Sequence, residues 1–377
     1  MRRRVRSDRG AAATLVAVLL AGGVLLGMTA LVVDVGQLYA EREELQSTAD
    51  STAMAVALDC AFDREGCDEA HLEAVGAHYA EGNVRDNLAD VFVCGNDERL
   101  PDCDDPQFDP RGNLTDCLGE RPEGGIAYVE VRTSTLKAGG STLLPPSFAQ
   151  TLVSGHEGTT VGACARVAWG SPGVGLALTI SHCEWDNATT DGDGGRDYAP
   201  KPPPHPHPDY ERVIKLHNTQ DPECEFPTPG QYGPGGFGWL MNEDCQVEFL
   251  EEEGEGEESE LWYRTGTGVG ADVPMDCRSV LEHAREHKIV LTIPVFDKTR
   301  GTGANLEFRL HDTAALVVTG YNNPGMPPAS SNLPGSTIEE CSGPDHCVYG
   351  YFVDDVGSGE LGPLPGELGL IAVRTVG

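Results

Sequence analysis

The sequence contains few basic residues. Lys and Arg number 26 against 60 Asp and Glu, which gives a formal net charge of −34, and the longest basic cluster lies within the first ten positions. A surface with so strong a negative field repels the phosphate backbone of nucleic acids. We therefore expect no nucleic-acid partner for this chain.

Several catalytic and cofactor-binding motifs are also missing. The chain has no G-x-S-x-G nucleophile elbow and no G-x-x-x-x-G-K-[ST] phosphate loop, and its Gly-rich stretches lack the strand and helix context that nucleotide binding requires. It has no C-x-x-C spacing either, which argues against a thioredoxin-type or zinc-knuckle site. No small-molecule substrate or cofactor is evident, and we expect a protein that is not an enzyme.

Cysteine, by contrast, is present in an even number. The 12 cysteines are scattered along the chain, a pattern typical of disulfides in an oxidising compartment. Cys341 and Cys347 lie six residues apart across a Gly-Pro loop and are the first expected pair, and Cys60 with Cys67 is the second. The sequence leaves the connectivity of the other eight open.

A long apolar run follows the basic tip. Residues 11–33 form 23 consecutive positions without a charge, enough for a helix that crosses a hydrocarbon core of about 30 Å. Arginines precede the run and Asp34 ends it, so the positive-inside rule places residues 1–10 in the cytoplasm and residues 34–377 outside. A cleaved signal peptide is the alternative, but its apolar region is usually only about 7–15 residues long and ends at a small-residue cleavage site. We expect a retained single-pass transmembrane helix.

The residues after the apolar run predict an amphipathic helical extension over 34–60. One stripe recurs at spacings of three and four residues, with acidic residues expected to face away from it. The stripe comprises Leu38, Arg42, Leu45, Ala49, Thr52 and Val56, and the acidic residues are Glu41, Glu43, Glu44 and Asp50. A continuous helix to about Leu58 would be about 70 Å long at ~1.5 Å per residue. A transmembrane helix followed by a separate juxtamembrane helix remains the alternative.

The rest of the chain predicts a β-rich domain. Short β-type runs separated by Gly, Pro and Asn occur at 126–131, 161–169, 289–296, 314–319 and 348–353, the last two as an antiparallel pair. Helices are expected at 68–88 and 277–288, and flexible loops near 186–210 and 251–260. The fold class is therefore α+β: a long N-terminal transmembrane and amphipathic helix, a Cys/Asp-rich segment at 61–125, and a β-rich, disulfide-bearing extracytoplasmic domain at 126–377.

Two segments are candidates for metal chemistry. His283, Glu286 and His287 spell H-x-x-E-H, in which two histidines one helical turn apart could bind zinc while the glutamate polarises water. Asp191, Asp193 and Asp197 lie in a Gly-rich stretch that superficially suggests calcium, but the spaced Glu and flanking helices of an EF-hand are missing. A solvated helix face and a polar turn are the favoured interpretations, and we expect no metal.

The N-terminal region closely resembles TadE/TadG-like Flp pilus-assembly proteins. The resemblance rests on residues 9–57, including "ALVVDVGQLYAEREELQSTADSTAMAVAL", and on later segments similar to actinobacterial members, such as "VGACARVAWGSP" at 161–172 and "CVYGYFV" at 347–353. Prepilin-like members carry a Gly before their cleavage point and a Glu five residues later. Here Leu15 occupies that position after Gly10, so we expect the arginine tip to be kept.

The resemblance implies a membrane-anchored, pseudopilin-like component of tight-adherence pilus assembly. Its expected partners are the lipid bilayer and other pilus-assembly membrane proteins or pilins, at the bacterial cell membrane. Two other functions stay open: a membrane-tethered zinc hydrolase that uses His283, Glu286 and His287, and an anchored surface adhesin.

Overall fold

We describe the chain from a computed structural model. The described residues are 9–62, 67–104, 117–122, 126–148, 157–190, 195–215, 237–241, 243–249, 261–265, 273–301, 305–342, 346–357 and 359–377. They form two compact units. The first unit, hereafter unit 1, comprises residues 1–122, 127–168 and 375–377, and unit 2 comprises residues 123–126 and 169–374.

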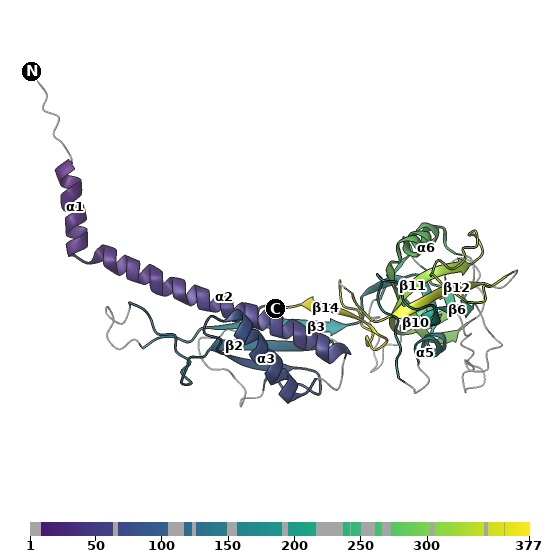
Figure 1. Ribbon diagram of the computed structural model, residues 1–377, viewed down its shortest axis with the longest axis horizontal. Coiled ribbons are helices and arrows are strands. Elements are labelled where there is room, and N and C mark those ends of the chain that lie inside the picture. Colours follow the sequence, from purple (N-terminus) through teal and green to yellow (C-terminus); the bar gives the residue numbers. More distant parts are fainter. Residues whose placement is uncertain are drawn as a thin grey trace, which may run out of the picture. The chain divides into compact units, whose positions relative to one another are not determined.

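Two helices, not one, occupy the N-terminal part of unit 1. Helix α1 spans Arg9–Ala21 and α2 spans Val24–Phe62 (Figure 1). They are separated at Gly22 and Gly23, and Gly23 has a φ of +71°, a backbone conformation that residues with a Cβ rarely adopt. The expected continuous helix from the apolar run to Leu58 is therefore wrong in this respect. In the described part of the chain, none of the helices combines the length and the apolar character that crossing a bilayer requires.

The second half of α2 is amphipathic, as expected, but its buried face differs in detail. Leu45, Ala49 and Val56 are fully buried, in agreement with the predicted stripe. Arg42 is exposed, however, and Glu41 is buried instead. The predicted stripe is therefore wrong at one position, about a quarter of a turn around the helix, because charged residues flank the buried positions at this end and the apolar pattern there is weak.

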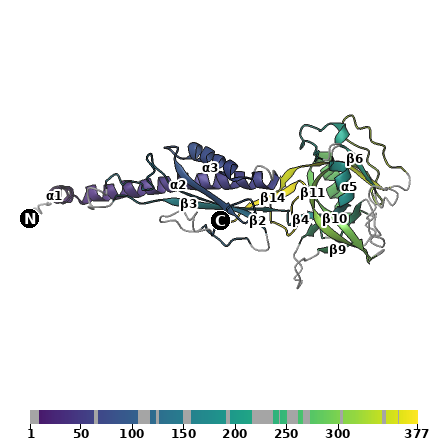
Figure 2. The ribbon, with the colours of Figure 1, turned by 90° about the horizontal axis from the view of Figure 1, so that it is seen from below.

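Unit 1 is completed by a small sheet and a second helix. Strands β1 (Ala89–Gly95), β2 (Ala127–Thr135) and β3 (Gly162–Gly170) lie in that order, and β1 pairs with β2 in antiparallel register. Figures 1 and 2 show α2 and α3 (Glu69–Asn83) on this sheet. Helix α3 and β1 come from residues 61–125, which the sequence analysis treated as a Cys/Asp-rich segment distinct from the N-terminal helix and from the β-rich domain. Residues 375–377 also join unit 1, because Arg166 in β3 exchanges backbone hydrogen bonds of 2.8 and 2.9 Å with Gly377 and Val376.

Unit 2 is built on a larger mixed sheet. Its central strands, β10 (Val290–Arg300), β11 (Glu307–Asn322) and β12 (Cys347–Val353), pair in antiparallel fashion, which confirms the expected pairing of 314–319 with 348–353. The remaining strands of the sheet are β6 (Arg212–Lys215), β5 (Leu178–Ser181), β7 (Phe237–Trp239) and β9 (Trp262–Arg264). Two further pairs are β4 (Val174–Leu176) with β8 (Gln246–Glu248), and β13 (Asp355–Gly357) with β14 (Leu370–Thr375).

Three short helical segments accompany this sheet. They are α5 (His182–Thr189), the 3₁₀-helix η1 (Pro208–Tyr210) and α6 (Met275–His287), the last close to the expected helix 277–288. Leu281 and Ala284 of α6 are buried in the same core as Leu316 and Val318 of β11. Alternate residues of β11 face this core, and those between them, such as Val317, are buried in a second core, so the strand is apolar on both faces.

Five disulfides join described cysteines, and the chain is an α+β protein with a β-rich remainder. Both pairs expected from the sequence are joined. The five bonds are Cys60–Cys67, Cys94–Cys103, Cys117–Cys164, Cys245–Cys277 and Cys341–Cys347. Each bond restrains the unfolded chain and so stabilises the fold by a few kcal/mol, typically about 2–4.

Candidate functional site: an exposed apolar helical surface and its support

The most unusual surface of unit 1 lies on α1 and the first third of α2. Large apolar side chains are exposed there, and Val32 is the most exposed of them at 71%. We call this set the apolar helical surface: Leu15, Val16, Val18, Leu20, Met28, Leu31, Val32, Val33 and Val35. A helix that is apolar on all sides is normally buried in a protein core or in a bilayer. This surface is therefore the part of the described chain best suited to an apolar partner.

Asp34 is the first charged residue of α2 after the uncharged run 11–33. Its side chain is buried, and its carboxylate accepts hydrogen bonds from the backbone N–H groups of Ser147 at 2.8 Å and Phe148 at 3.0 Å. The Ser147 hydroxyl also donates to Gln37 at 3.0 Å. These bonds fix the connection between β2 and β3 to α2 directly after the uncharged run.

Beyond Asp34, α2 packs on the sheet. Leu45, Ala49 and Ala53 are fully buried, and the small alanines allow the helix backbone to approach β2 closely. Two side chains bridge the layers. The Thr133 hydroxyl donates to the carbonyl of Leu45 at 3.0 Å, and the Gln46 amide donates to the carbonyl of Cys164 at 3.0 Å. The same helix thus has an unpacked first part and a firmly packed second part.

Charged contacts add to this packing at the edge of the sheet. Lys137 lies 3.4 Å from Glu41 and 2.8 Å from Asp86, and Arg85 contacts Glu44 at 2.8 Å. Partial burial lowers the pKa of Lys137, but the hydrogen bond with Asp86 and the charge of Glu41 outweigh it, so the net pKa is raised. Lys137 therefore stays charged and keeps both carboxylates paired.

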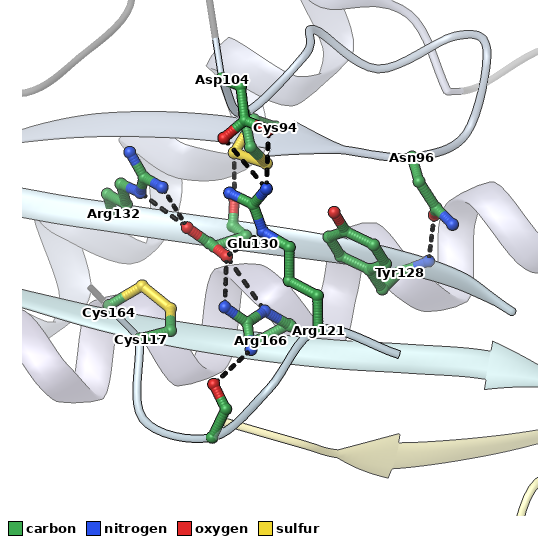
Figure 3. Close-up of polar contacts among 12 residues, drawn as sticks. Cys94, Asn96, Asp104, Cys117, Arg121, Tyr128, Glu130, Arg132, Cys164 and Arg166 are labelled. Carbon is green, nitrogen blue, oxygen red and sulfur yellow. Dashed lines mark hydrogen bonds and ion pairs between the residues drawn. A yellow bond between two sulfur atoms is a disulfide. The ribbon is translucent and has the colours of Figure 1, made fainter. Parts of the chain in front are cut away.

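The sheet under α2 contains a buried carboxylate surrounded by arginines. Glu130 is fully buried in β2; Arg132 donates to it at 2.7 Å and Arg166 at 2.7 and 3.0 Å (Figure 3). Arg121 lies 3.7 Å away and also pairs with the exposed Asp104 at 2.9 Å. We call Glu130, Arg132, Arg166 and Arg121 the Glu130 cluster.

The Glu130 cluster is electrostatically satisfied. Burial by itself would raise the pKa of Glu130, but the hydrogen bonds from Arg166 and Arg132 outweigh burial and hold its pKa below the ordinary value. Glu130 therefore stays ionised at neutral pH. A carboxylate held in this way is a poor general acid or base, so the arrangement supports the sheet, not proton transfer.

Two disulfides flank the Glu130 cluster. Ligand atoms of Cys94, Cys103 and Glu130, and those of Cys117, Cys164 and Glu130, lie within 4.8 Å of one another. The sulfurs in both groups are consumed in the bonds Cys94–Cys103 and Cys117–Cys164. Because a cysteine binds zinc only as a free thiolate, these four sulfurs cannot act as metal ligands in the oxidised protein.

The structure brings part of the H-x-x-E-H motif together. His283 and His287 lie on α6 with ring centroids 4.3 Å apart, and both are exposed, as is Glu286. In the described ranges, the ligand clusters of three or more residues leave these histidines out. The motif therefore lies on a solvated face of α6, with its apolar side chains turned into the core of unit 2.

The Asp-rich stretch lies mostly outside the described residues. Asp191 and Asp193 belong to the part that the structure does not describe, and so does the expected loop 251–260. Asp197 is described, is exposed, and accepts a hydrogen bond from Tyr210. The calcium hypothesis therefore stays untested by the structure.

Sequence reasoning missed the Glu130 cluster. Glu130 and Arg166 each stand inside a run that the sequence already predicted as a strand, at 126–131 and 161–169. Charges of opposite sign within two adjacent β-type runs were the available signal. Nothing in their spacing, 36 positions apart, indicated that the two strands would be neighbours.

The structure defines a class of protein with a long N-terminal helical region whose first part is apolar and exposed. The last part of this region packs on a sheet that carries disulfides, and a second, β-rich unit follows. Residues 10–59 match the family described as putative Flp pilus-assembly TadE/G-like, so the chain carries such a domain there. This match covers α1 and nearly all of α2. Neither the curated proteins nor the solved structures contain a significant match to this chain. The domain and the disulfides indicate a role in Flp pilus assembly and an extracytoplasmic or envelope location.

Proposed function

We propose that this chain is a membrane-anchored, pseudopilin-like component of Flp pilus assembly that acts through protein–protein contacts and has no enzymatic activity. In this proposal residues 11–33 lie in the cell membrane and residues 1–10 in the cytoplasm. Residues 34–377 face the extracytoplasmic side. The partners are the bilayer and other membrane proteins of the assembly machinery or pilins.

One observation carries the proposal: the TadE/G-like region at 10–59 coincides with the helix that exposes the apolar helical surface. Water contact by so many large apolar side chains is unfavourable, at about 25 cal/mol for each Å² of apolar surface. A bilayer removes that surface from water along the whole uncharged run. The five described disulfides support the orientation, because such bonds persist in oxidising compartments.

The proposal is tested by complementing a gene-deletion strain with a variant of the apolar helical surface. Val18→Asp combined with Leu20→Asp places two carboxylates near the middle of the run, where each costs about 2.5–3.5 kcal/mol in a membrane helix. We expect the variant to leave the membrane fraction in carbonate extraction and to fail to restore piliation. Wild-type protein should restore piliation and stay in the membrane.

Met54→Asp is the matched control. Met54 is an exposed apolar side chain of α2, but it lies outside the uncharged run. This variant should fractionate and complement like the wild type. Unchanged piliation in the deletion strain, or a doubly substituted protein that remains in the membrane and complements fully, would contradict the proposal.

The two other candidate functions have separate tests. Stoichiometric zinc in the purified protein, lost in His283→Ala, would favour the hydrolase. An isolated gene, without neighbouring secretion-ATPase and TadE-like genes, would favour the adhesin. The exposed positions of His283 and His287 on a solvated helix face give the hydrolase little structural support.

A further inference from the structure

The connection between β2 and β3 is unusually poor in charge. Residues 138–155 contain no Asp, Glu, Lys or Arg, although charged residues make up 23% of the chain. In its described part this connection exposes Leu143 and Phe148, the latter to 47%. An exposed segment with apolar side chains and no charge is unexpected in a protein of net charge −34.

Three contacts give the direction of this connection relative to α2. Thr133 at the end of β2 bonds to the carbonyl of Leu45, Lys137 contacts Glu41, and Ser147 bonds to Asp34. As the chain leaves β2, each contact thus lies closer to the start of α2. The 11 residues from Leu45 back to Asp34 correspond to about 16 Å along a helix. The connection therefore runs beside α2 toward the uncharged run and reaches the residue that ends it.

Of the two charged residues that border the uncharged stretch, Lys137 remains on the side of the sheet, and Glu157 is exposed two positions before Thr159, the backbone partner of Leu144. Lys137, the last charged residue before the uncharged stretch, pairs with Glu41 and Asp86. Glu41 lies seven positions after Asp34, which is about 10 Å along the helix axis. Ser147 and Phe148, which are uncharged, reach past this point to the level of Asp34.

The backbone of the connection is also suited to an apolar environment. Leu144 and Thr159 exchange backbone hydrogen bonds of 2.9 and 3.3 Å, and the Lys137 N–H donates to the carbonyl of Ser141 at 2.8 Å. The amides of Ser147 and Phe148 are satisfied by Asp34. Backbone groups that enter a bilayer must be paired, because the hydrocarbon offers no replacement for water.

From these observations we infer that the β2–β3 connection, through Leu143, Leu144 and Phe148, inserts into the interfacial layer of the same bilayer that holds residues 11–33. This inference rests on the proposed membrane location of that run. These three side chains then contact lipid at the depth of the headgroups and the first acyl carbons. Unit 1 then contacts the membrane at two places, the helix and the connection, and the bonds of Asp34 hold the two together.

The test uses Trp fluorescence of the full chain in vesicles that contain brominated phosphatidylcholine. The four native Trp residues, 169, 185, 239 and 262, are common to all variants, so the emission of an introduced indole is obtained by subtracting the wild-type signal. In Phe148→Trp we expect shallow bromines to quench at least half of the added emission and deep bromines to quench less. Met54→Trp is the control, since Met54 lies 20 positions after Asp34 in α2, about 30 Å further along, and its added emission should not be quenched.

Flotation of the vesicles separates the possible failures. If the Phe148→Trp protein floats with the vesicles but its added emission is not quenched, the inference is wrong while the proposed membrane location stands. A second copy bound at the loop would give this result. If the added emission is quenched equally in Phe148→Trp and Met54→Trp, the protein lies flat on the bilayer and the inference is also wrong. If the protein does not float, the proposed membrane location fails and the inference fails with it.

Discussion

The two units each bury a carboxylate in a central strand, and they satisfy it in opposite ways. In unit 1, Glu130 is surrounded by arginine side chains, and its pKa lies below the ordinary value. In unit 2, Asp312 of β11 accepts hydrogen bonds from the backbone N–H groups of Thr313, Gly366 and Glu367 at 2.7, 2.9 and 2.5 Å. Burial outweighs those bonds and raises the pKa of Asp312 to about 6. Burial alone thus does not decide the protonation state of a carboxylate; its partners do.

The difference gives the two units opposite responses to acid. Because the pKa of Glu130 is lowered on folding, its stabilisation is present above its unfolded value of 4.5 and is lost as the pH falls through the folded value. Because the pKa of Asp312 is raised from 3.8 to about 6, its stabilisation is complete below 3.8 and is lost as the pH rises to about 6. Acid should therefore weaken this part of unit 1 and strengthen this part of unit 2.

The largest expected effect comes from removing the arginine partner. Arg166→Ala leaves Glu130 buried with one of its two closest cations missing, which should cost about 3–5 kcal/mol of stability. Hydrogen exchange read by mass spectrometry should show faster exchange in α2 and β2, with unit 2 unchanged. Arg264→Ala in unit 2 is the control, because the Arg264 side chain is 70% exposed and a surface ion pair such as the one it forms with Glu307 is worth about 0–1 kcal/mol. Equal effects of the two variants would remove the distinction between the units.

The disulfides of the two units also differ in the length of the loop that they close. Cys245–Cys277 closes a separation of 32 residues in unit 2, whereas Cys60–Cys67 closes one of 7 in unit 1. Chain-entropy arguments give about 3–4 kcal/mol for the first and about 2 kcal/mol for the second. Urea denaturation of the two double Cys→Ser variants, followed by circular dichroism, measures both losses. A larger loss for the short loop would show that native packing, not chain entropy, dominates.

The pH response of unit 2 should depend on Asp312. Asp312→Asn removes the titration, so the wild type should lose stability relative to the variant between pH 4 and 7, by on the order of 3 kcal/mol. Three of the four native Trp residues, Trp185, Trp239 and Trp262, lie within unit 2, so most of the emission follows its unfolding in urea. The amide leaves one backbone N–H less well satisfied, but that loss does not change with pH. Parallel pH profiles of the two proteins would show that Asp312 stays ionised throughout.

The smallest effect concerns the start of α3 in unit 1. Asp68 caps this helix by accepting the N–H of His71 at 2.8 Å. Asp68→Ala should cost about 1 kcal/mol, whereas Asp68→Asn keeps an acceptor and should cost little. Amide exchange in α3 measures both. An equal loss in both variants would attribute the effect to the charge of Asp68 and not to the cap.

The sequence predicted those features that depend on local patterns. The helix at 277–288, the strands at 289–296, 314–319 and 348–353, and the pairs Cys60–Cys67 and Cys341–Cys347 follow from periodicity and short spacing, whereas the short strands β4 to β9 were not predicted. The interruption at Gly22 and Gly23 was missed, because an uncharged run that contains glycine still matches a membrane helix. The Glu130 cluster was missed for a different reason: it requires knowing that β2 and β3 are neighbours, and long-range pairing has no local signature.

The pairing of Arg166 with Val376 and Gly377 has a consequence for biogenesis. The backbone of β3 receives these partners from residues that follow all of unit 2 in the sequence. Because a chain is synthesised from its N-terminus, β3 lacks these backbone partners, next to the Glu130 cluster, until all of unit 2 has been made. The fold of unit 1 can therefore be completed only after unit 2 has been synthesised.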